Sequence, residues 1–350
     1  MQRQELLKAL EIVKPGLASK DMIEQATCFA FMDGHVVTYN DEISIRHPID
    51  IGVTGAVKAE ELHGLLSKLK PEEIDIEAGE GEIQIKAGRT SAGLTMHCEI
   101  RLPLEELGEN GDWKDVPEGF VEGASFCLFS CSKDMSRPTL TCVHINKEIV
   151  ESCDNMRMTR YTLNKPFPIA SLLIPASSLA EILKYPIMKV SQSKGWVHFK
   201  SKLGTVISAR VFEDNYVDLA PFINHGQDSQ ELKMPASIES TLERAGIFAK
   251  SQFDSDQLVS MTMADKRMTV AAKNDAGWIS EQLNMSYSGD PISFSIHPRT
   301  LQDILKKTSK FRVTDSVIEF GGDNWVHIAA LLAESEKKEE KPGKKKKRGK

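Results

Sequence analysis

The pattern of apolar and polar positions repeats three times along the chain. In each copy, a helical stretch carries apolar residues at i, i+3 and i+4, which is the buried stripe of an amphipathic helix. The matched leucines of the three stretches are Leu62, Leu179 and Leu301. They lie 117 and 122 residues apart, which is the length of a small domain. The chain is therefore predicted to contain three copies of one module.

Each module also begins with a helix, and short strands with period-two alternation follow both helices. The first helices are predicted over residues 6–13, 120–131 and 238–248. The strand pairs after them are predicted over 27–31 with 35–39, 140–145 with 149–153, and 258–263 with 268–272. Further strands are predicted over 74–76, 83–85, 94–96, 188–190, 196–199, 206–209, 311–313, 317–320 and 325–328. The order predicts an α+β fold, with two helices per module packed on antiparallel sheets.

The charge of the chain is unevenly distributed. Residues 337–350 carry nine Lys or Arg and two Glu, so the rest of the chain has a net charge of −13, against −6 for the whole. A Lys-rich tail of this kind is predicted to be disordered, and it serves either as a phosphate contact or as a solvated end. The predicted helical windows together are less acidic than the remaining surface. This distribution of charge indicates that the helices form the surface that contacts a polyanion.

The candidate chemistry is sparse. The six cysteines form no Cys-x-x-Cys pair, and Cys127 and Cys131 have no ligand-like partners in sequence, so we expect buried reduced thiols and no metal or cofactor. Gly79-Glu-Gly81 stands between two strands, and no phosphate-loop, zinc-protease or nucleophile-elbow motif occurs. The N-terminus has no signal-peptide core, and no apolar run is long enough to cross a membrane. These features favour a cytoplasmic binding protein over an enzyme, with hydrolysis as a minor alternative.

Three stretches in the middle of the chain carry a family resemblance. They are Arg137-Pro-Thr-Leu-Thr, Glu151-Ser-Cys-Asp-Asn-Met-Arg-Met, and Phe212-Glu-Asp-Asn-Tyr-Val-Asp-Leu-Ala-Pro. In this order they resemble the middle domain of the bacterial β sliding clamp, the processivity subunit of the replicative DNA polymerase III. Arg244-Ala-Gly-Ile-Phe is similar to the first helix of the third clamp domain. The resemblance covers about residues 1–334 and is strongest over 120–320.

The resemblance implies an architecture and a role. Clamps of this family are head-to-tail homodimers whose six domains form a ring around double-stranded DNA. Here the domains are expected over 1–117, 120–233 and 235–336, followed by the tail 337–350. The chain is expected to hold the replicative polymerase, the clamp loader and other proteins with clamp-binding motifs on DNA without regard to sequence. The alternative is a DNA-associated scaffold that binds peptide motifs and never closes into a ring.

The resemblance also implies a seam that closes the ring. Ile247 and Phe248 are expected to pack across it onto the strand near 94–100 of the second copy. His97 and Glu99 stand there where the family has apolar residues, which leaves the strength of the seam open. The alternative is that Ile247 and Phe248 are core residues of the third module.

Two further surfaces are implied. The cleft for partner peptides is expected between the second and third domains, and the Met-rich lining suits varied ligands. Two phrases depart from the family: Asp154-Asn-Met-Arg replaces Asp-Gly-His-Arg, and Ala329-Ala-Leu-Leu replaces the usual Met-Pro-Met ending. The expected cleft residues are Leu140, Cys153, Asn155, Met156, Arg157, Met158, Leu219, Ile328, Ala330, Leu331 and Leu332. The expected DNA-facing cations are Lys20, Lys68, Lys70, Arg137, Lys184, Arg299, Lys306, Lys307 and Lys310. The alternative for Met156 and Met158 is ordinary strand packing, and Lys20 and Arg137 could equally be solvated surface cations.

Overall fold

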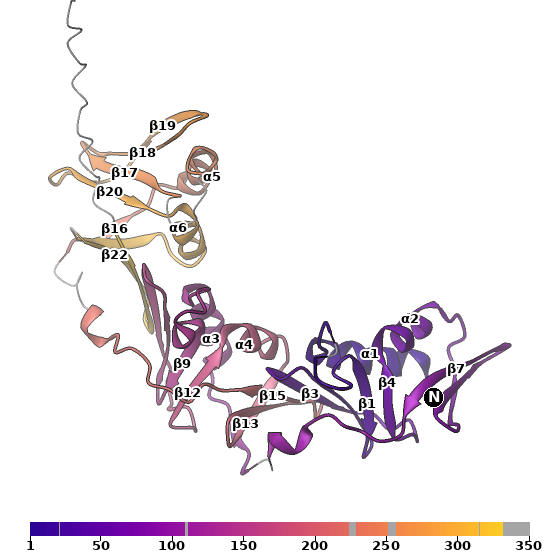
Figure 1. Cartoon of the computed structure of the whole chain (residues 1–350). Helices are drawn as coiled ribbons and strands as arrows, with labels where there is room; N and C mark the ends of the chain where they lie inside the picture. The colour runs from indigo at the N-terminus through magenta and orange to yellow at the C-terminus, as the bar shows by residue number, and fades with distance from the viewer. Residues whose placement is uncertain (21, 109–110, 224–228, 251–256, 315, 332–350) are drawn as a thin grey trace, which may run out of the picture. The chain divides into compact units, whose positions relative to one another are not determined.

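The computed structural model describes residues 1–20, 22–108, 111–223, 229–250, 257–314 and 316–331 (Figure 1). The tail 337–350 and the predicted cleft residue Leu332 lie outside this part of the chain. The chain forms two compact units, one of residues 1–218 and one that begins at Leu219.

One order of elements occurs three times: a helix, four strands, a second helix and three strands. The helices are α1 (Arg3–Val13), α2 (Ala59–Lys68), α3 (Phe120–Cys127), α4 (Ala176–Ile182), α5 (Ile238–Phe248) and α6 (Pro298–Leu305). The strands of the first copy are β1 (Cys28–Met32), β2 (His35–Tyr39), β3 (Ile43–Pro48), β4 (Gly55–Lys58), β5 (Asp75–Ala78), β6 (Glu82–Ala87) and β7 (Thr90–His97). Those of the second are β9 (Cys142–Asn146), β10 (Ile149–Cys153), β11 (Arg157–Thr162), β12 (Ser171–Pro175), β13 (Ile187–Ser193), β14 (Trp196–Ser201) and β15 (Val206–Arg210). Those of the third are β17 (Val259–Ala264), β18 (Arg267–Asn274), β19 (Gly277–Asn284), β20 (Ile292–Ile296), β21 (Lys310–Val313), β22 (Val317–Gly321) and β23 (Trp325–Ala330). Two-residue strands, β8 (Lys114–Asp115) and β16 (Leu232–Lys233), precede the second and third copies.

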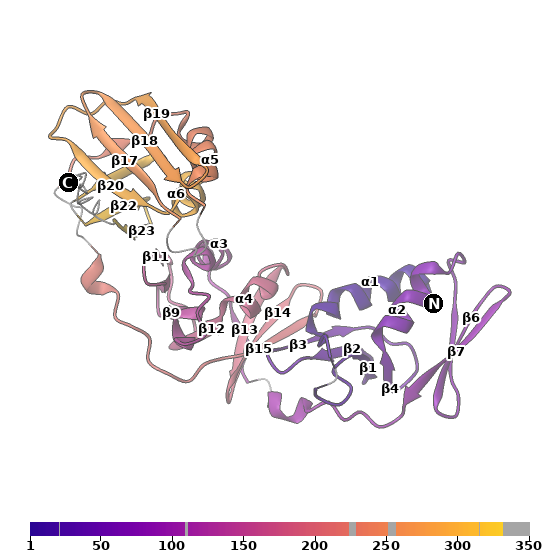
Figure 2. The same ribbon diagram turned by 45° about the horizontal axis from the view of Figure 1, so that its top comes forward.

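All pairing within the units is antiparallel. In the first unit, one sheet has the order β5-β6-β7-β4-β1-β2-β3-β15-β14-β13-β8, and a second group of strands pairs in the order β12-β9-β10-β11. In the second unit, β19-β18-β17-β20 form one sheet, and β23, β22, β21 and β16 pair in that order. The helices α1 and α2 lie side by side over one face of the first sheet (Figures 1 and 2). The predicted α+β fold class is thereby confirmed.

The helices form where the sequence provides an apolar stripe and suitable ends. Leu6, Leu10 and Val13 lie on the buried face of α1, and Leu62 and Leu66 lie on that of α2. Burial of one leucine side chain contributes about 1.5–3 kcal/mol to the stability of the fold. The intrinsic helix propensity of such short segments contributes less, so these helices are stabilised mainly by packing of their apolar faces. The α6 helix has Pro298 in its first turn, and the His297 side chain accepts a hydrogen bond from the N–H of Arg299 at 3.2 Å. Proline and a side-chain cap are well suited to a helix start, because the first N–H groups lack partners within the helix.

One sheet joins the first two copies of the repeat. Strand β3 pairs with β15, with Ile43 opposite Ala209 and Ser44 opposite Ser208. Beside this junction Trp196 is almost fully buried, with the Tyr39 ring centroid 6.0 Å from its own. The Arg210 guanidinium lies 4.7 Å above the Trp196 ring, and its Nη2 is 2.6 Å from Asp41 Oδ1. A continuous sheet and an aromatic contact therefore make one unit of residues 1–218.

Three sequence predictions about local structure are wrong. The helix predicted over 120–131 ends at Cys127 and continues as a 3₁₀ turn, Leu128–Ser130. Leu140, predicted at the start of a strand, lies in the 3₁₀ turn Pro138–Thr141, because Pro138 favours helical φ and cannot join a strand ladder. Cys98 is exposed, whereas the other five cysteines are buried free thiols as predicted.

Candidate binding surfaces

Apart from Leu140, the predicted cleft residues of the first unit lie on the hairpin of β10 and β11. Its turn is held by Asp154, whose Oδ1 accepts hydrogen bonds from the N–H groups of Met156 at 2.8 Å and Arg157 at 2.9 Å. The Arg157 Nε also donates to Asp154 Oδ2 at 3.1 Å. An aspartate that binds the backbone two residues on is a typical turn-forming device. The turn presents Met156 to solvent with 42% of its surface exposed.

The base of the hairpin is apolar and closely packed. Cys153 lies opposite Met158, and both side chains are buried. The N–H of Cys153 donates to the Tyr216 hydroxyl at 3.0 Å, and this hydroxyl donates to Cys153 Sγ at 3.5 Å. The Tyr216 ring stacks on His144 with centroids 4.7 Å apart. Burial raises the pKa of the Cys153 thiol and that of the Tyr216 hydroxyl, so both groups are neutral and serve packing rather than nucleophilic chemistry.

Two arginines define the rim of the same surface. The Arg157 guanidinium lies 5.4 Å from the centroid of the Phe129 ring, which is a cation–π contact. Arg137 Nη1 donates to Asn155 Oδ1 at 3.2 Å and so links the 3₁₀ turn that contains Leu140 to the hairpin. Arg137 was predicted to face DNA, but its bond places it beside the predicted cleft residues. Phe129 and Tyr216 are absent from the predicted cleft, although Tyr216 belongs to one of the stretches that carry the resemblance.

The remaining cleft residues belong to the second unit. Leu219 is buried and precedes a 3₁₀ turn, Ala220–Phe222. Ile328 is buried in β23, and Ala330 is half-buried at the end of that strand. The N–H of Leu331 donates to the carbonyl of Ser316 at 2.8 Å, which extends the pairing of β22 and β23. That these residues and the β10–β11 hairpin form one cleft stays a prediction.

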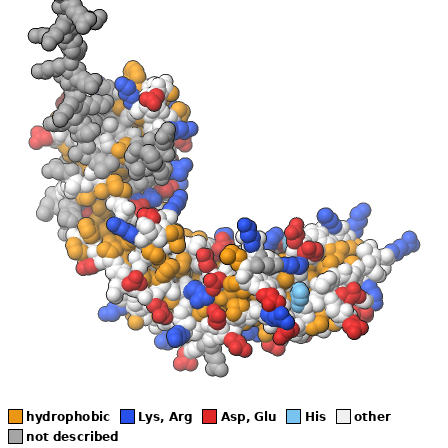
Figure 3. Space-filling view, viewed as in Figure 1, with side chains coloured by type: hydrophobic (Ala, Val, Ile, Leu, Met, Phe, Trp, Pro, Cys, Tyr) orange, Lys and Arg blue, Asp and Glu red, His pale blue; other side chains and the backbone are white. Residues whose placement is uncertain are grey.

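All nine predicted DNA-facing cations are exposed, and several have acidic neighbours. The Lys184 Nζ is 2.6 Å from Glu181, Lys306 is 3.2 Å from Asp303, and Lys310 is 3.0 Å from Glu231. Exposed pairs of this kind contribute at most about 1 kcal/mol, so the lysines can exchange their partner for a phosphate. On the face shown in Figure 3, Lys and Arg are interspersed with Asp and Glu. Such a surface attracts a polyanion weakly.

The predicted seam residues occupy different environments. Ile247, at the end of α5, is 57% exposed, which excludes the alternative that it is a core residue. Phe248 is half-buried, and a Cβ added to Gly277 in β19 would lie 3.2 Å from its ring. His97 is exposed and pairs with Ala56 of β4. Glu99 is exposed and forms an ion pair with Arg101 at 2.9 Å.

The described residues contain no cluster of three or more His, Cys, Asp or Glu side chains arranged to hold a metal ion. Every helix in the described ranges is too short or too polar to serve as a membrane span.

Solved structures resemble this chain over nearly its whole length. The β subunit of DNA polymerase III from Pseudomonas aeruginosa superposes with a TM-score of 0.83 at 14% identity, over 95% of this chain and 98% of that one. The β chain from Streptococcus pneumoniae gives 0.83 at 19% identity with the same coverage. A sliding clamp from Bartonella birtlesii bound to griselimycin gives 0.82 at 17%, again with the same coverage. No protein-family model and no curated protein matches the sequence. The chain therefore has the sliding-clamp fold, as the family resemblance predicted.

Proposed function

We propose that the protein is a DNA sliding clamp, a non-enzymatic ring that encircles duplex DNA in the cytoplasm and holds the replicative polymerase on it. The observation that carries this proposal is the likeness to bacterial DNA polymerase III β subunits over 95% of the chain. Fold alone does not determine function, so the proposal also depends on surfaces of this particular chain. Three modules per chain require two copies, head to tail, for a six-domain ring.

The charge of the proposed DNA-facing surface supports sliding. Dense pairing of Lys and Arg with phosphates gives affinity that falls steeply with salt and hinders movement. Here Lys306 and Lys310 have acidic partners at 3.2 and 3.0 Å, so their attraction for phosphate is moderated. A ring that holds DNA by topology needs only such weak contacts.

The β10–β11 hairpin supports a docking surface for short apolar peptides of the polymerase, the clamp loader and other partners. The exposed Met156 thioether is flexible and polarisable, and the buried Cys153 and Met158 lie beneath the turn. Arg157, which lies over Phe129, adds a cation at the rim. A groove of this composition tolerates different apolar side chains.

Griselimycin tests this surface, because a sliding clamp of the same fold binds it. Calorimetry should detect binding to the wild-type protein, and Met156→Ala should weaken it by about 1 kcal/mol, or roughly fivefold. Met188→Ala is the matched control, since Met188 is similarly exposed, at 52%, outside the hairpin. Equal loss in both variants, or none in either, would contradict the proposed surface.

A topological experiment tests the clamp itself. The protein is loaded onto nicked circular plasmid by a clamp loader and ATP, and bound protein is separated by gel filtration in moderate salt. A ring stays with the circle and is lost when a restriction enzyme linearises it. The alternative, a DNA-associated scaffold that binds peptide motifs without closing, remains bound equally to circular and linear plasmid. That result would replace the proposed function by the scaffold.

A further inference from the structure

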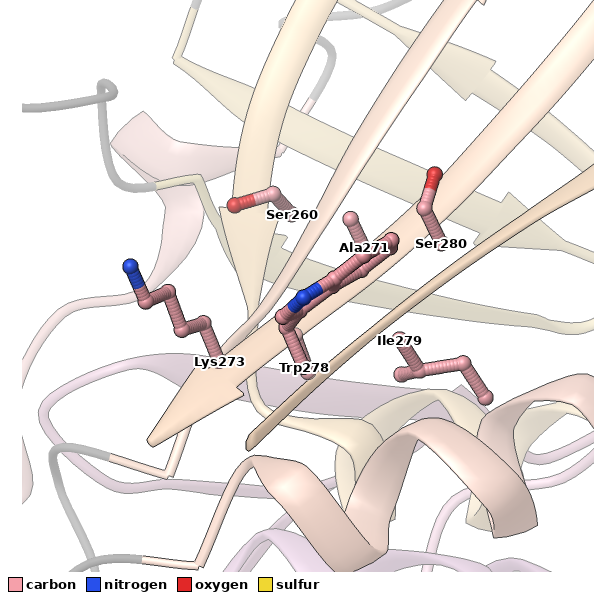
Figure 4. Close-up of a pocket in the computed structure, with 7 residues that line it drawn as sticks. Ser260, Ala271, Lys273, Trp278, Ile279 and Ser280 are labelled. Atoms are coloured by element: carbon pink, nitrogen blue, oxygen red, sulfur yellow. The ribbon is translucent and has the colours of Figure 1, made fainter. Parts of the chain in front are cut away.

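One sheet face of the second unit carries an exposed tryptophan. Trp278 in β19 is 69% exposed and lies opposite Lys273 of β18. Figure 4 shows its indole beside Ala271, at a shallow hollow of about 460 Å³ that Ser260 and Ser280 also line. Single apolar residues are common on protein surfaces, so the surroundings of Trp278 decide whether it marks a binding site.

The face that carries Trp278 is the one that points away from α5. The Glu281 carboxylate of β19 accepts hydrogen bonds from Arg244 of α5 at 2.7 and 3.0 Å. Successive residues of a strand point to opposite faces of a sheet. Trp278, Ser280 and Gln282 therefore project from the outer face, and all three are exposed.

The residues around Trp278 on this face are small or carry hydroxyl groups. The Ser260 hydroxyl lies 3.4 Å from that of Ser295. The Thr262 hydroxyl lies 2.9 Å from that of Ser293. Two rows of paired residues cross the sheet, Ser295-Ser260-Ala271-Ser280 and Ser293-Thr262-Thr269-Gln282. The indole therefore stands beside a surface of short side chains that can form hydrogen bonds.

The corresponding face of the first copy is apolar and covered. There it belongs to a buried cluster that Leu102 and Trp196 complete. Positions in the two copies correspond by counting outward from the two-residue turns at 33–34 and 265–266. The buried residues Cys28, Ala30 and Tyr39 then correspond to Ser260, Thr262 and Ala271. The third copy has exchanged a core surface for one that suits a polar ligand.

The hairpin that carries Trp278 is also longer than its counterparts. Four residues, 40–43, separate the last paired residues of β2 and β3, and four, 154–157, separate those of β10 and β11. In the third copy eight residues, 272–279, separate the corresponding positions of β18 and β19, and the pairing continues through them. Trp278 and Lys273 lie in this extension. The core shared by the three copies therefore does not require them.

The charges on the outer face favour an anion. Lys273 and Arg267 lie near the two ends of β18, and both are exposed. In the described residues Lys273 forms no ion pair, and Arg267 donates to the uncharged Gln282 at 3.1 Å. The nearby Asp265 and Asp275 lie in the turns rather than in the strands. A face whose strands present cations without carboxylates is unusual in a chain with a net charge of −6, and it attracts a polyanion.

We propose that this face binds single-stranded DNA, with one unpaired base stacked on the Trp278 indole and the phosphates beside Lys273 and Arg267. Every base has a π-face, so the contact does not depend on sequence. A duplex cannot make it, because its bases are stacked on one another. The hydroxyls of Ser260 and Ser280 supply hydrogen bonds to phosphate or sugar oxygens. The choice of DNA over RNA rests on the proposed function, whereas the stacking surface requires no closed ring.

Fluorescence anisotropy of a labelled oligothymidylate of about 12 nucleotides tests the stacking. The full-length protein should bind it at low salt. Trp278→Ala should raise the dissociation constant about tenfold, and Trp278→Phe, which keeps an aromatic ring, should raise it less. Phe222→Ala is the matched control, because Phe222 is an aromatic residue of the second unit that is 52% exposed outside this sheet, and it should change nothing. A duplex of the same length should bind the wild-type protein and Trp278→Ala equally.

The salt dependence of the same binding tests the cation. Lys273→Gln should reduce the slope of log K against log salt concentration by about 0.7, which is the value for one phosphate contact on a single strand. Lys202→Gln is the matched control, since Lys202 is an exposed lysine of the first unit. An equal change of slope in both variants would contradict a phosphate contact at Lys273.

Failure of this inference can be told from failure of the proposed clamp. Equal affinity of the wild-type protein and Trp278→Ala for oligothymidylate overturns single-strand binding and leaves the hollow to a protein partner. An equal loss of affinity for the duplex overturns base stacking, and tighter Trp278-dependent binding of oligouridylate overturns the choice of DNA. Retention on loaded plasmid circles should be the same for the wild-type protein and Trp278→Ala, so loss of the ring would appear only in that assay.

Discussion

Acid should weaken the first unit through one buried imidazole. His198 lies in β14 opposite Ser208, the residue of β15 that pairs with Ser44 of β3. Its Nδ1 is 2.8 Å from the Ser208 hydroxyl and its Nε2 is 2.9 Å from the Ser193 hydroxyl. Both nitrogens are satisfied by neutral partners, and burial lowers the pKa of His198 to about 4. A second proton would place an unpaired charge within the junction of the first two modules.

The size of the effect follows from proton linkage. The imidazole of an unfolded chain has a pKa of about 6.5, so the unfolded state takes up a proton before the folded state does. Stability from this residue is therefore complete above pH 6.5 and is lost as the pH falls toward 4. The expected loss is about 2 kcal/mol between pH 7 and 5, and about 3 kcal/mol by pH 4. This is a large part of the stability of a typical domain.

Denaturant unfolding of the wild-type protein and of His198→Gln measures this loss. Tryptophan fluorescence reports the first unit through Trp196, which is buried at the same junction, once Trp278→Phe and Trp325→Phe in both proteins remove the signal of the second unit. Glutamine does not titrate, so other acid-sensitive groups cancel in the difference between the two proteins. Between pH 7 and 5, the free energy of unfolding of the wild-type protein should fall by about 2 kcal/mol more than that of the variant. Parallel pH curves for the two proteins would refute the assignment of the acid effect to His198.

Two other predictions concern the ring. Ile247→Asp with Phe248→Asp should give a folded monomer, because two carboxylates cannot be buried in an apolar seam; a wild-type native mass would rule out Ile247 and Phe248 as seam residues. Reversing the charge of Lys306, Lys307 and Lys310 to Glu should reduce retention on loaded plasmid circles while the circular dichroism spectrum stays unchanged, since all three side chains are exposed. Undiminished retention would count against a DNA-facing surface at the end of α6.

The sequence pattern predicted the two helices of each module, the first two strands after the first helix and the three strands after the second helix. It missed the third and fourth strands of each module. In β19, polar and charged residues interrupt the apolar positions, so the alternation of its two faces becomes visible only when its sheet partners are known. The strand β4 has only four residues, which is too short for a clear pattern. The strand β12 contains a continuous run, Leu172–Ile174, which period-two alternation does not detect. These strands are specified by pairing with distant segments, so a local pattern carries little information about them.

The surface around the β10–β11 hairpin could also be predicted only in part. The residues from Cys153 to Met158 belong to one hairpin, so a local motif places them together. Phe129 and Tyr216 reach the same surface from other segments, through a cation–π contact and a hydrogen bond to Cys153. Such contacts depend on the tertiary fold, and only the motif around Tyr216 offered a signal for one of them.

The repeat also shows what joins the first two modules. The β3–β15 junction lies within one chain, so it forms without loss of translational freedom, and it adds the buried Trp196 and the Arg210–Asp41 ion pair. A ring made of two copies must instead overcome the entropy of association at each seam. Substitutions that weaken a seam between copies should therefore change the lifetime of the ring without changing the fold of either unit.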